Sequence, residues 1–236
     1  MSSAATPYWQ AKIWGLLHDP ALKALRPTQN LGDEGPWDVL DCMKGWASPK
    51  LTPKDNPYQG TWKKHLAKCD TLASASDRTS IGRLPNQVAV AYSAEPDKGL
   101  QISHLFSGEP QRLHFDADKV PQHGRAEALR QIERDAIPEE IRTCDDPRQV
   151  FWWLWRCYPE AIAQQLDERI HLLPADTRIP DASLWSHTAT TAALAGGLAG
   201  RYADAADYPL KNARVDEASL SRPTLLNFTF TPIQQF

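Results

Sequence analysis

Residues 14–25, WGLLHDPALKAL, place a histidine and an aspartate at the end of an apolar helix, and this pair constrains the fold more than any other feature. Pro20 disfavours a helical conformation at the preceding residue and suits the first turn of a new helix, so His18 and Asp19 are predicted to lie at a helix junction. A buried imidazole beside a carboxylate is costly unless something satisfies both. We expect that partner to be a metal ion. The preceding helix is predicted over residues 8–17, with one apolar face: Trp9, Ile13, Leu16 and Leu17.

Two further helices each present an inward polar residue of metal-ligand type. Asp70 belongs to the apolar stripe of a helix predicted over residues 61–75. His187 lies on the inward face of a helix that begins at a cap, Asp181 or Ser183, and runs to about residue 203. Small residues in the second half of that helix let another helix approach closely: Ala192, Ala193, Gly196, Gly197 and Gly200.

Convergence of these side chains would create a site of two histidines and two aspartates. Mixed imidazole and carboxylate ligation suits transition-metal ions and leaves positions open for a water, which the ion would acidify into a nucleophile. Asp77 follows Asp70 by seven residues, roughly 10 Å along an unbroken helix, which is too far to share one ion. It is expected to orient Arg78, a substrate phosphate or a ligand.

Basic side chains around the Asp70 helix are candidate phosphate contacts, although each fits a solvated charged face equally well. The residues selected for substrate binding are Lys64, Lys68 and Arg78, with Lys63 and Arg83 nearby. Their presence is compatible with a phosphodiester substrate, whose exposed single-stranded form can also stack its bases on aromatic side chains.

The rest of the chain predicts a mainly α domain with a small antiparallel β insertion. QVAVAYS, LQISHLF and QRLHF, separated by turn signals within residues 86–115, are typical of strands. Further helices are expected over residues 125–136 and 147–173, the second bent or broken at Pro159. The second carries an aromatic cluster predicted to lie in the core: Phe151, Trp152, Trp153 and Trp155. Residues 32–57 are expected to be irregular, with a short helix at 39–45.

Composition fits a folded protein with a sizeable core. The chain has 236 residues, of which 42% are hydrophobic and 23% charged, with a formal net charge of -3 that neither favours nor excludes nucleic acid. Four cysteines form no C-x-x-C pair, and residues 1–10 lack the pattern of a signal peptide. We expect reduced thiols, a cytoplasmic location and no membrane span.

Several motifs, taken together and in order, resemble the N-terminal part of the large subunit of type III-B (Cmr) CRISPR-Cas effector complexes. They are LLHDP followed by KALRP, CDTLASASDR, LPADTRIPDASLWSHTATTAALAGGLAG and FTFTPIQQF. The resemblance covers nearly the whole chain, and the PADTRIPD, LWSHT and ALAG block is its most distinctive part.

The resemblance implies a circularly permuted HD-superfamily helical domain over residues 1–222. His18 and Asp19 match the H-D doublet, Asp70 the later aspartate, for which Asp77 competes, and His187 the displaced first histidine. The implied activity is cleavage of single-stranded DNA with a divalent metal ion (Mn, Ni, Mg or Co), in which His18, Asp19 and Asp77 would take catalytic roles. Implied partners are the other Cmr subunits, with guide RNA and target RNA bound through the complex.

Within residues 223–236, Leu226, Phe228 and Phe230 alternate with polar residues, the pattern of a half-buried strand. The resemblance implies that this segment is the first strand of a truncated palm-like domain. No GGDD-type cyclase motif is present, so synthesis of cyclic oligoadenylates is not expected of this chain. Two alternatives remain open: a catalytically silent scaffold that docks other subunits, and a nucleotide phosphohydrolase of the wider HD superfamily.

Overall fold

The protein is built mainly from helices, as predicted. The computed structural model describes residues 6–26, 35–44, 63–74, 92–93, 98–103, 107–121, 123–176, 182–200, 210–211 and 214–215, with the backbone alone at 6, 63–65, 67, 103, 210–211 and 214–215. The α-helices are α1 (Thr6–Leu17), α2 (Lys63–Ala73), α4 (Arg125–Asp135), α5 (Glu139–Arg142), α6 (Pro147–Gln165) and α7 (Leu184–Ala199). The predicted helices over residues 8–17 and 125–136 are thereby confirmed, and so is the helix over residues 61–75 within its described part.

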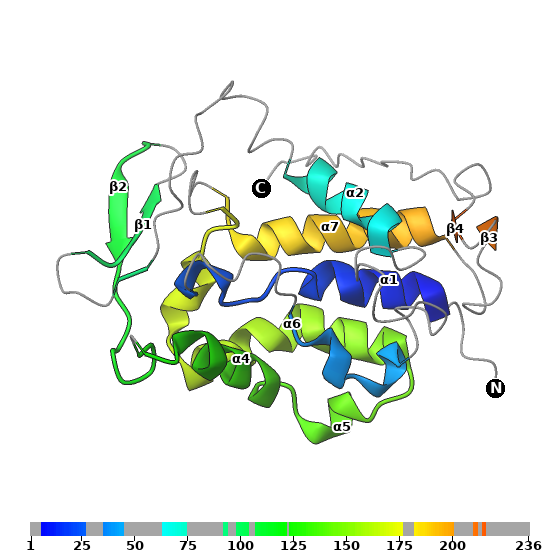
Figure 1. The fold of residues 1–236 in the computed structure, drawn as a ribbon, viewed down its shortest axis with the longest axis horizontal. Helices are drawn as coiled ribbons and strands as arrows, with labels where there is room; N and C mark the ends of the chain where they lie inside the picture. The colour runs from blue at the N-terminus through cyan, green and yellow to red at the C-terminus, as the bar shows by residue number, and fades with distance from the viewer. Residues whose placement is uncertain are drawn as a thin grey trace, which may run out of the picture.

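Helix α1 occupies the centre of the described helices. It lies between α6 and α7, while α2 packs against α7 and also touches α1 (Figure 1). Fully buried aliphatic side chains from all of these elements fill the space between them, among them Ile13, Leu17, Leu66 and Ile162. The apolar stripes that the sequence predicts therefore face one another across a shared core.

Helices α1 and α7 approach unusually closely because small residues meet where they cross. A Cβ atom added to Gly15 would lie 2.5 Å from Cα of Ala192, so only glycine fits at that point of α1. The prediction that small residues of α7 admit a neighbouring helix is confirmed. The crossing lies three residues before His18 and five residues after His187, which brings both imidazoles toward the same place.

The turn after α1 is fixed by a buried carboxylate from α4. Glu133 Oε1 accepts a hydrogen bond of 2.7 Å from the backbone N–H of Leu22, and Oε2 accepts one of 2.5 Å from Nη2 of Arg26. Both charged side chains are almost completely buried. The 3₁₀ turn Lys23–Leu25 lies between these two contacts. Glu133 thus holds the segment that follows His18 and Asp19 in a defined position.

Helix α7 begins and ends at recognisable caps. The hydroxyl of Ser183 accepts a hydrogen bond from the backbone N–H of Ser186, so Ser183 is the cap. The helix ends at Ala199, earlier than predicted, because Gly200 adopts φ +71°, a conformation that favours glycine and stops a helix. Residues 201–203, the predicted end of this helix, lie outside the described residues.

The β element is small and antiparallel, as predicted. Strand β1 (Leu100–Ser103) pairs with β2 (Pro110–Leu113), with Leu100 opposite Leu113. A second short antiparallel pair joins β3 (Leu210–Lys211) to β4 (Arg214–Val215). Two segments predicted as strands lie largely or wholly outside the described residues: only Tyr92 and Ser93 of QVAVAYS are described, and no residue of the terminal segment 223–236 is.

Helix α6 differs from the prediction in three respects. It runs without a break through Pro159 to Gln165, and a separate 3₁₀ segment, Glu168–Leu172, follows it. The predicted core cluster is only partly correct, because Phe151 is buried and Trp153 partly buried, whereas Trp152 and Trp155 are exposed. The helix packs on α1 through one face, and its tryptophans are spaced so that they fall on both faces.

Short connecting turns differ in detail from the expectations. In place of a helix at residues 39–45, the chain forms two 3₁₀ turns, Trp37–Val39 and Asp41–Met43, and the short helix α5 was not predicted. Across the described helices, none combines the length and the apolar character needed to cross a bilayer.

Candidate metal centre

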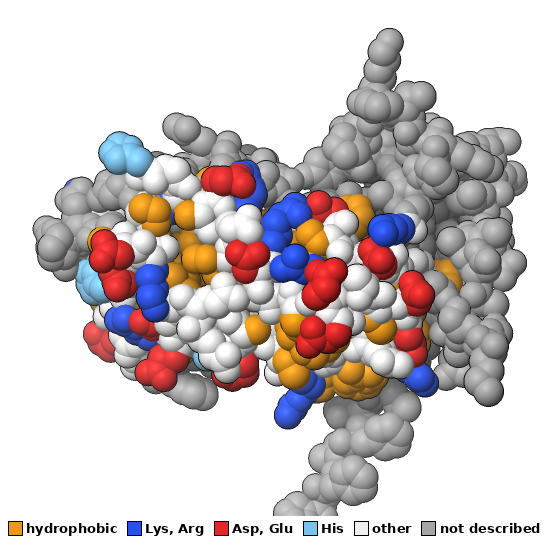
Figure 2. All heavy atoms as spheres, turned by 90° about the horizontal axis from the view of Figure 1, so that it is seen from below, with side chains coloured by type: hydrophobic (Ala, Val, Ile, Leu, Met, Phe, Trp, Pro, Cys, Tyr) orange, Lys and Arg blue, Asp and Glu red, His pale blue; other side chains and the backbone are white. Residues whose placement is uncertain are grey.

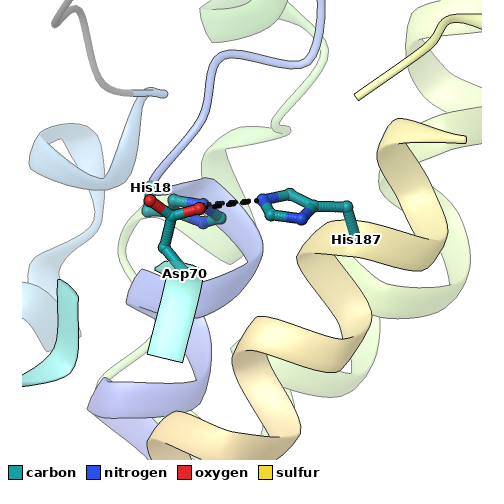
Figure 3. A group of neighbouring side chains, drawn as sticks. All are labelled: His18, Asp70 and His187. Atoms are coloured by element: carbon teal, nitrogen blue, oxygen red, sulfur yellow. Dashed lines mark hydrogen bonds and ion pairs between the residues drawn. The ribbon is translucent and has the colours of Figure 1, made fainter. Parts of the chain in front are cut away.

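Three helices bring two imidazoles and a carboxylate to one point. His18 follows the end of α1, Asp70 lies near the end of α2 and His187 is in the second turn of α7 (Figure 3). One possible ligand atom from each lies within 4.8 Å of the other two. Residues separated by more than a hundred positions in the chain therefore form a group that could hold a metal ion.

His18 is oriented by its own helix. Its Nδ1–H donates a hydrogen bond of 2.8 Å to the backbone carbonyl of Gly15. This bond requires a proton on Nδ1 and directs Nε2 into the cluster, as is usual for metal-binding histidines. The ring also packs against Trp14, with centroids 5.4 Å apart.

His187 is held by burial in α7. Its side chain is 4% exposed, and its Nε2 lies 3.3 Å from Nε2 of His18. Nδ1 of His187 is buried and has no hydrogen-bond partner within the described part of the chain. Packing between α1 and α7, rather than a carbonyl acceptor, therefore sets the orientation of this ring.

Asp70 closes the cluster from the third helix. Its Oδ1 lies 3.2 Å from Nε2 of His187 and 3.6 Å from Nε2 of His18. Leu66 and Cys69 are buried and anchor α2, while the hydroxyl of Ser74 donates to the Asp70 carbonyl and secures the last turn. The Asp70 side chain is 36% exposed, so this carboxylate lies where the cluster opens to solvent.

Asp19 supplies a second carboxylate to the same place. Its Oδ2 lies 3.5 Å from Nε2 of His18 and 3.5 Å from Nε2 of His187. Nζ of Lys23, four residues along the chain, lies 2.5 Å from the same oxygen. The structure therefore brings together all four residues that the sequence predicts as ligands, and their binding of an ion stays a prediction.

The separations between donor atoms fit a single ion. With metal–ligand bonds of about 2.1 Å, neighbouring donors lie about 3.0 Å apart at right angles and about 3.4 Å apart in a tetrahedron. The two imidazole nitrogens, and each nitrogen to each carboxylate oxygen, are 3.2 to 3.6 Å apart. The spacing of the His18, Asp70 and His187 donors thus suits a divalent ion without rearrangement of the helices, and Asp19 lies beside both imidazoles.

The electrostatics of the cluster favour a cation at its centre. Burial by itself would raise the pKa of both carboxyl groups, but His18 and His187, with Lys23 beside Asp19, outweigh it and hold the pKa of Asp19 and of Asp70 well below the usual range. Burial lowers the pKa of His187, but hydrogen bonding to Asp19 and Asp70 raises it more, to about 9. Without an ion, a protonated His187 is the cation that the carboxylates stabilise.

The neighbouring thiol is unsuited to compete as a ligand. Burial, with a smaller effect of the Asp70 charge, raises the pKa of Cys69 to about 11. The thiolate that binds metal is therefore scarce at neutral pH. The available donors are hard or intermediate, imidazole and carboxylate, which favours ions of the first transition row or magnesium over softer ones.

The structure describes the other predicted site residues only in part. Lys68 is exposed on α2, and for Lys64 only the backbone, within α2, is described. Asp77 and Arg78 lie outside the described residues. Sequence reasoning overlooked Lys23 and Glu133; a basic residue four positions after Asp19, within helical reach, was a signal for the former, whereas nothing local indicated the latter.

Comparison of the chain with protein-family models, with curated proteins and with solved structures gave no match. The function is therefore argued from the cluster of His18, Asp19, Asp70 and His187 and from the sequence motifs around them.

Proposed function

We propose that this protein is a metal-dependent phosphodiesterase that cleaves single-stranded DNA. The observation that carries the proposal is the convergence of His18, Asp70 and His187, whose ligand atoms lie within 4.8 Å of one another, with Asp19 Oδ2 3.5 Å from both imidazoles. Mn, Ni, Mg and Co are the candidate ions. An ion bound there supplies Lewis acidity toward a phosphoryl oxygen and acidifies a water for attack at phosphorus.

The residues of the cluster have different roles in such a reaction. His18 and His187 provide neutral imidazole donors, and His187 gives up its proton when the ion binds. Asp19 and Asp70 neutralise the charge of the ion and, as the unprotonated forms favoured by their lowered pKa, are able to accept hydrogen bonds from a water. The exposed position of Asp70 leaves one side of the cluster accessible to a substrate.

The order of these residues along the chain supports assignment to the HD superfamily in a circularly permuted form. The H-D doublet ends the first helix, the later aspartate lies on α2, and the remaining histidine lies on α7, the last described helix. This is the order implied by the resemblance to the large subunit of type III-B CRISPR-Cas complexes. We infer from it a role in RNA-guided antiviral defence, in which other Cmr subunits, guide RNA and target RNA are the partners.

The test is cleavage of labelled DNA by purified protein in the presence of Mn, Ni, Mg or Co in turn. Wild type should cut a single-stranded oligonucleotide and leave its duplex intact, and the double variant His18→Ala/Asp19→Ala should be inactive. His171→Ala is the matched control, because His171 is a partly exposed histidine that pairs with Glu160, outside the cluster. Equal cleavage by wild type and by the double variant would rule out the proposed centre.

A silent scaffold predicts a different result from the same assay. Wild type would then fail to cut DNA with every ion, both alone and after assembly with the other Cmr subunits and RNA. Metal binding by the wild type but not by the double variant, combined with cleavage in the assembled complex only, would support a nuclease that the complex activates.

A further inference from the structure

Helix α6 presents two tryptophans to solvent. Trp152 is 48% exposed and Trp155 is 44% exposed, and both lie within the first half of the helix. They are one turn apart, with ring centroids separated by 5.5 Å and planes inclined at 71°. Large aromatic side chains left half in water forgo hydrophobic stabilisation, and such groups on a surface are characteristic of binding sites.

The aromatic surface continues onto α1. The ring of Trp9 lies 6.2 Å from that of Trp152 and 5.0 Å from that of Tyr8. Phe151 lies beneath them, 5.4 Å from both Trp9 and Trp152. We call Tyr8, Trp9, Trp152 and Trp155 the aromatic row. It is a continuous series of rings that joins two packed helices.

Basic side chains accompany the aromatic row. Arg148 and Arg156 are exposed one turn before and one turn after Trp152, and the guanidinium of Arg156 lies 5.7 Å from the ring centroid of Trp155. On α1, Nζ of Lys12 lies 4.4 Å from the ring centroid of Phe151 and also faces Tyr8 and Trp9. These are cation–π contacts, which leave the positive charge available to an anion.

Few carboxylates offset these charges. Arg148 lies 3.5 Å from Asp146, the cap of its own helix. Lys12 and Arg156 form no ion pair with any residue in the described part of the chain. Seen from the side on which α4, α5 and α6 lie, the described surface carries a gathering of hydrophobic side chains, with both basic and acidic side chains around it (Figure 2).

We propose that the aromatic row and its basic neighbours bind single-stranded nucleic acid. Bases stack on exposed aromatic faces, and Lys12 and Arg156 attract the phosphates, which is the combination found in sequence-tolerant single-strand binding. Unpaired cations match an anionic ligand, which favours nucleic acid over a neutral protein surface. The choice of nucleic acid also rests on the proposed function, since a nuclease needs a surface that holds the strand it cuts.

The aromatic row is separate from the metal centre. Trp9 precedes His18 by nine residues, roughly 14 Å along α1 at the usual rise per residue. A strand bound on the aromatic row therefore leaves the ligands free, and binding there can be measured with no metal present.

The test is fluorescence anisotropy of a labelled single-stranded oligodeoxythymidine titrated with protein in EDTA. Trp152→Ala/Trp155→Ala should raise Kd roughly tenfold or more, since each lost stack is a substantial part of such binding. Trp152→Phe/Trp155→Phe keeps two rings and should recover most of the affinity. Arg156→Glu should weaken binding and reduce its dependence on salt.

Matched controls separate the surface from general effects of substitution. Leu172→Ala removes another exposed hydrophobic side chain, and Arg112→Glu reverses another exposed charge on β2; both should keep the wild-type Kd. Asp70→Ala should also bind DNA normally while it fails to cut. Circular dichroism of each variant checks that a lower affinity does not reflect loss of the fold.

Three results would overturn the inference. Wild type that does not bind the oligonucleotide, or a tryptophan pair whose removal leaves Kd unchanged, would exclude a single-strand site here. Self-association of wild type that Trp152→Ala/Trp155→Ala abolishes, seen by sedimentation velocity with unchanged DNA affinity, would identify a protein interface instead. None of these results bears on cleavage at His18 and Asp19, so the proposed function would stand or fall separately.

Discussion

Three nitrogen atoms of the candidate metal centre surround one carboxylate oxygen, Oδ2 of Asp19. Nζ of Lys23 lies 2.5 Å from it, and the Nε2 atoms of His18 and His187 each lie 3.5 Å from it. An incoming ion therefore competes with the Lys23 ammonium and the protonated His187 imidazole for this oxygen. Metal affinity in this protein should therefore depend on how easily Lys23 is displaced from Asp19 and how easily His187 loses its proton.

Metal binding should release a proton from His187 at neutral pH. Because the pKa of His187 is raised to about 9, its ring is protonated at pH 7 and must lose that proton to become a ligand. Affinity should rise about tenfold for each pH unit up to about 9 and then level off. Calorimetry in two buffers of different ionisation enthalpy measures the proton; its absence at pH 7 would contradict this reading of the site.

The same shift predicts how the stability of the metal-free protein changes with pH. A histidine whose pKa is raised above its unfolded value of about 6.5 stabilises the fold fully below that value and loses this contribution as pH rises through about 9. The free energy of unfolding in EDTA should therefore fall between pH 7 and 9.5. His187→Ala should weaken this dependence, and the same slope in both proteins would contradict it.

Removal of the Lys23 charge should strengthen metal binding. Lys23→Met keeps a long side chain but deletes a positive charge that holds Asp19 and repels a divalent ion, so Kd for Mn²⁺ should fall several-fold. Lys44→Met is the control, since that lysine is exposed and pairs with Asp41 instead. Weaker Mn²⁺ binding by Lys23→Met would show that the lysine supports the ligands rather than competes with the ion.

Helix packing, rather than any single side chain, creates the site. The close contact of Gly15 with Ala192 determines how α1 and α7 cross, and Glu133 of α4 fixes the turn that follows Asp19. The sequence indicated the close crossing of α1 and α7, because small residues cluster in α7. The sequence could not indicate the contact made by Glu133, because this residue lies more than a hundred positions from its partners. The residues around Glu133 suggest only an ordinary surface helix.

Gly15→Ala should destabilise the protein and weaken metal binding together. Alanine favours the helical state by about 1 kcal/mol, but a Cβ 2.5 Å from Cα of Ala192 forces the helices apart, and overpacking of this kind typically costs about 1–3 kcal/mol or more. His18 moves with α1, so Mn²⁺ affinity should fall as well. Ala193→Ser, on the exposed side of α7, should change neither quantity. Urea denaturation and calorimetry provide both measurements.

Glu133→Ala should be among the most destabilising single substitutions in α4. It removes the carboxylate that pairs with the buried Arg26, and breaking a buried pair in this way typically costs about 3–5 kcal/mol. Glu127→Ala, on the same helix, removes an exposed partner of Arg130 and should cost less than about 0.5 kcal/mol. Similar unfolding free energies for the two variants would show that the buried pair does not hold the turn.

Across the whole molecule, the features that the sequence predicted correctly are those that depend on hydrophobic periodicity alone. The three ligand-bearing segments, their inward polar residues and the antiparallel β element follow from local patterns, and the structure bears them out. The failure at Trp152 and Trp155 has a plain cause: hydrophobic character predicts burial on average, but which face of α6 meets α1 depends on tertiary packing. Lys23 was overlooked although its spacing of four residues from Asp19 is a local signal for an ion pair.

The central claim is that one ion joins the helices, and the most direct test is to locate that ion. Crystals soaked in Mn²⁺ should show an anomalous peak about 2 Å from Nε2 of His18, Nε2 of His187 and Oδ1 of Asp70, with Asp19 nearby. The same crystals of His18→Ala/Asp19→Ala should lack it. Saturating Mn²⁺ with no peak among these side chains, or a peak only elsewhere, would contradict the central claim.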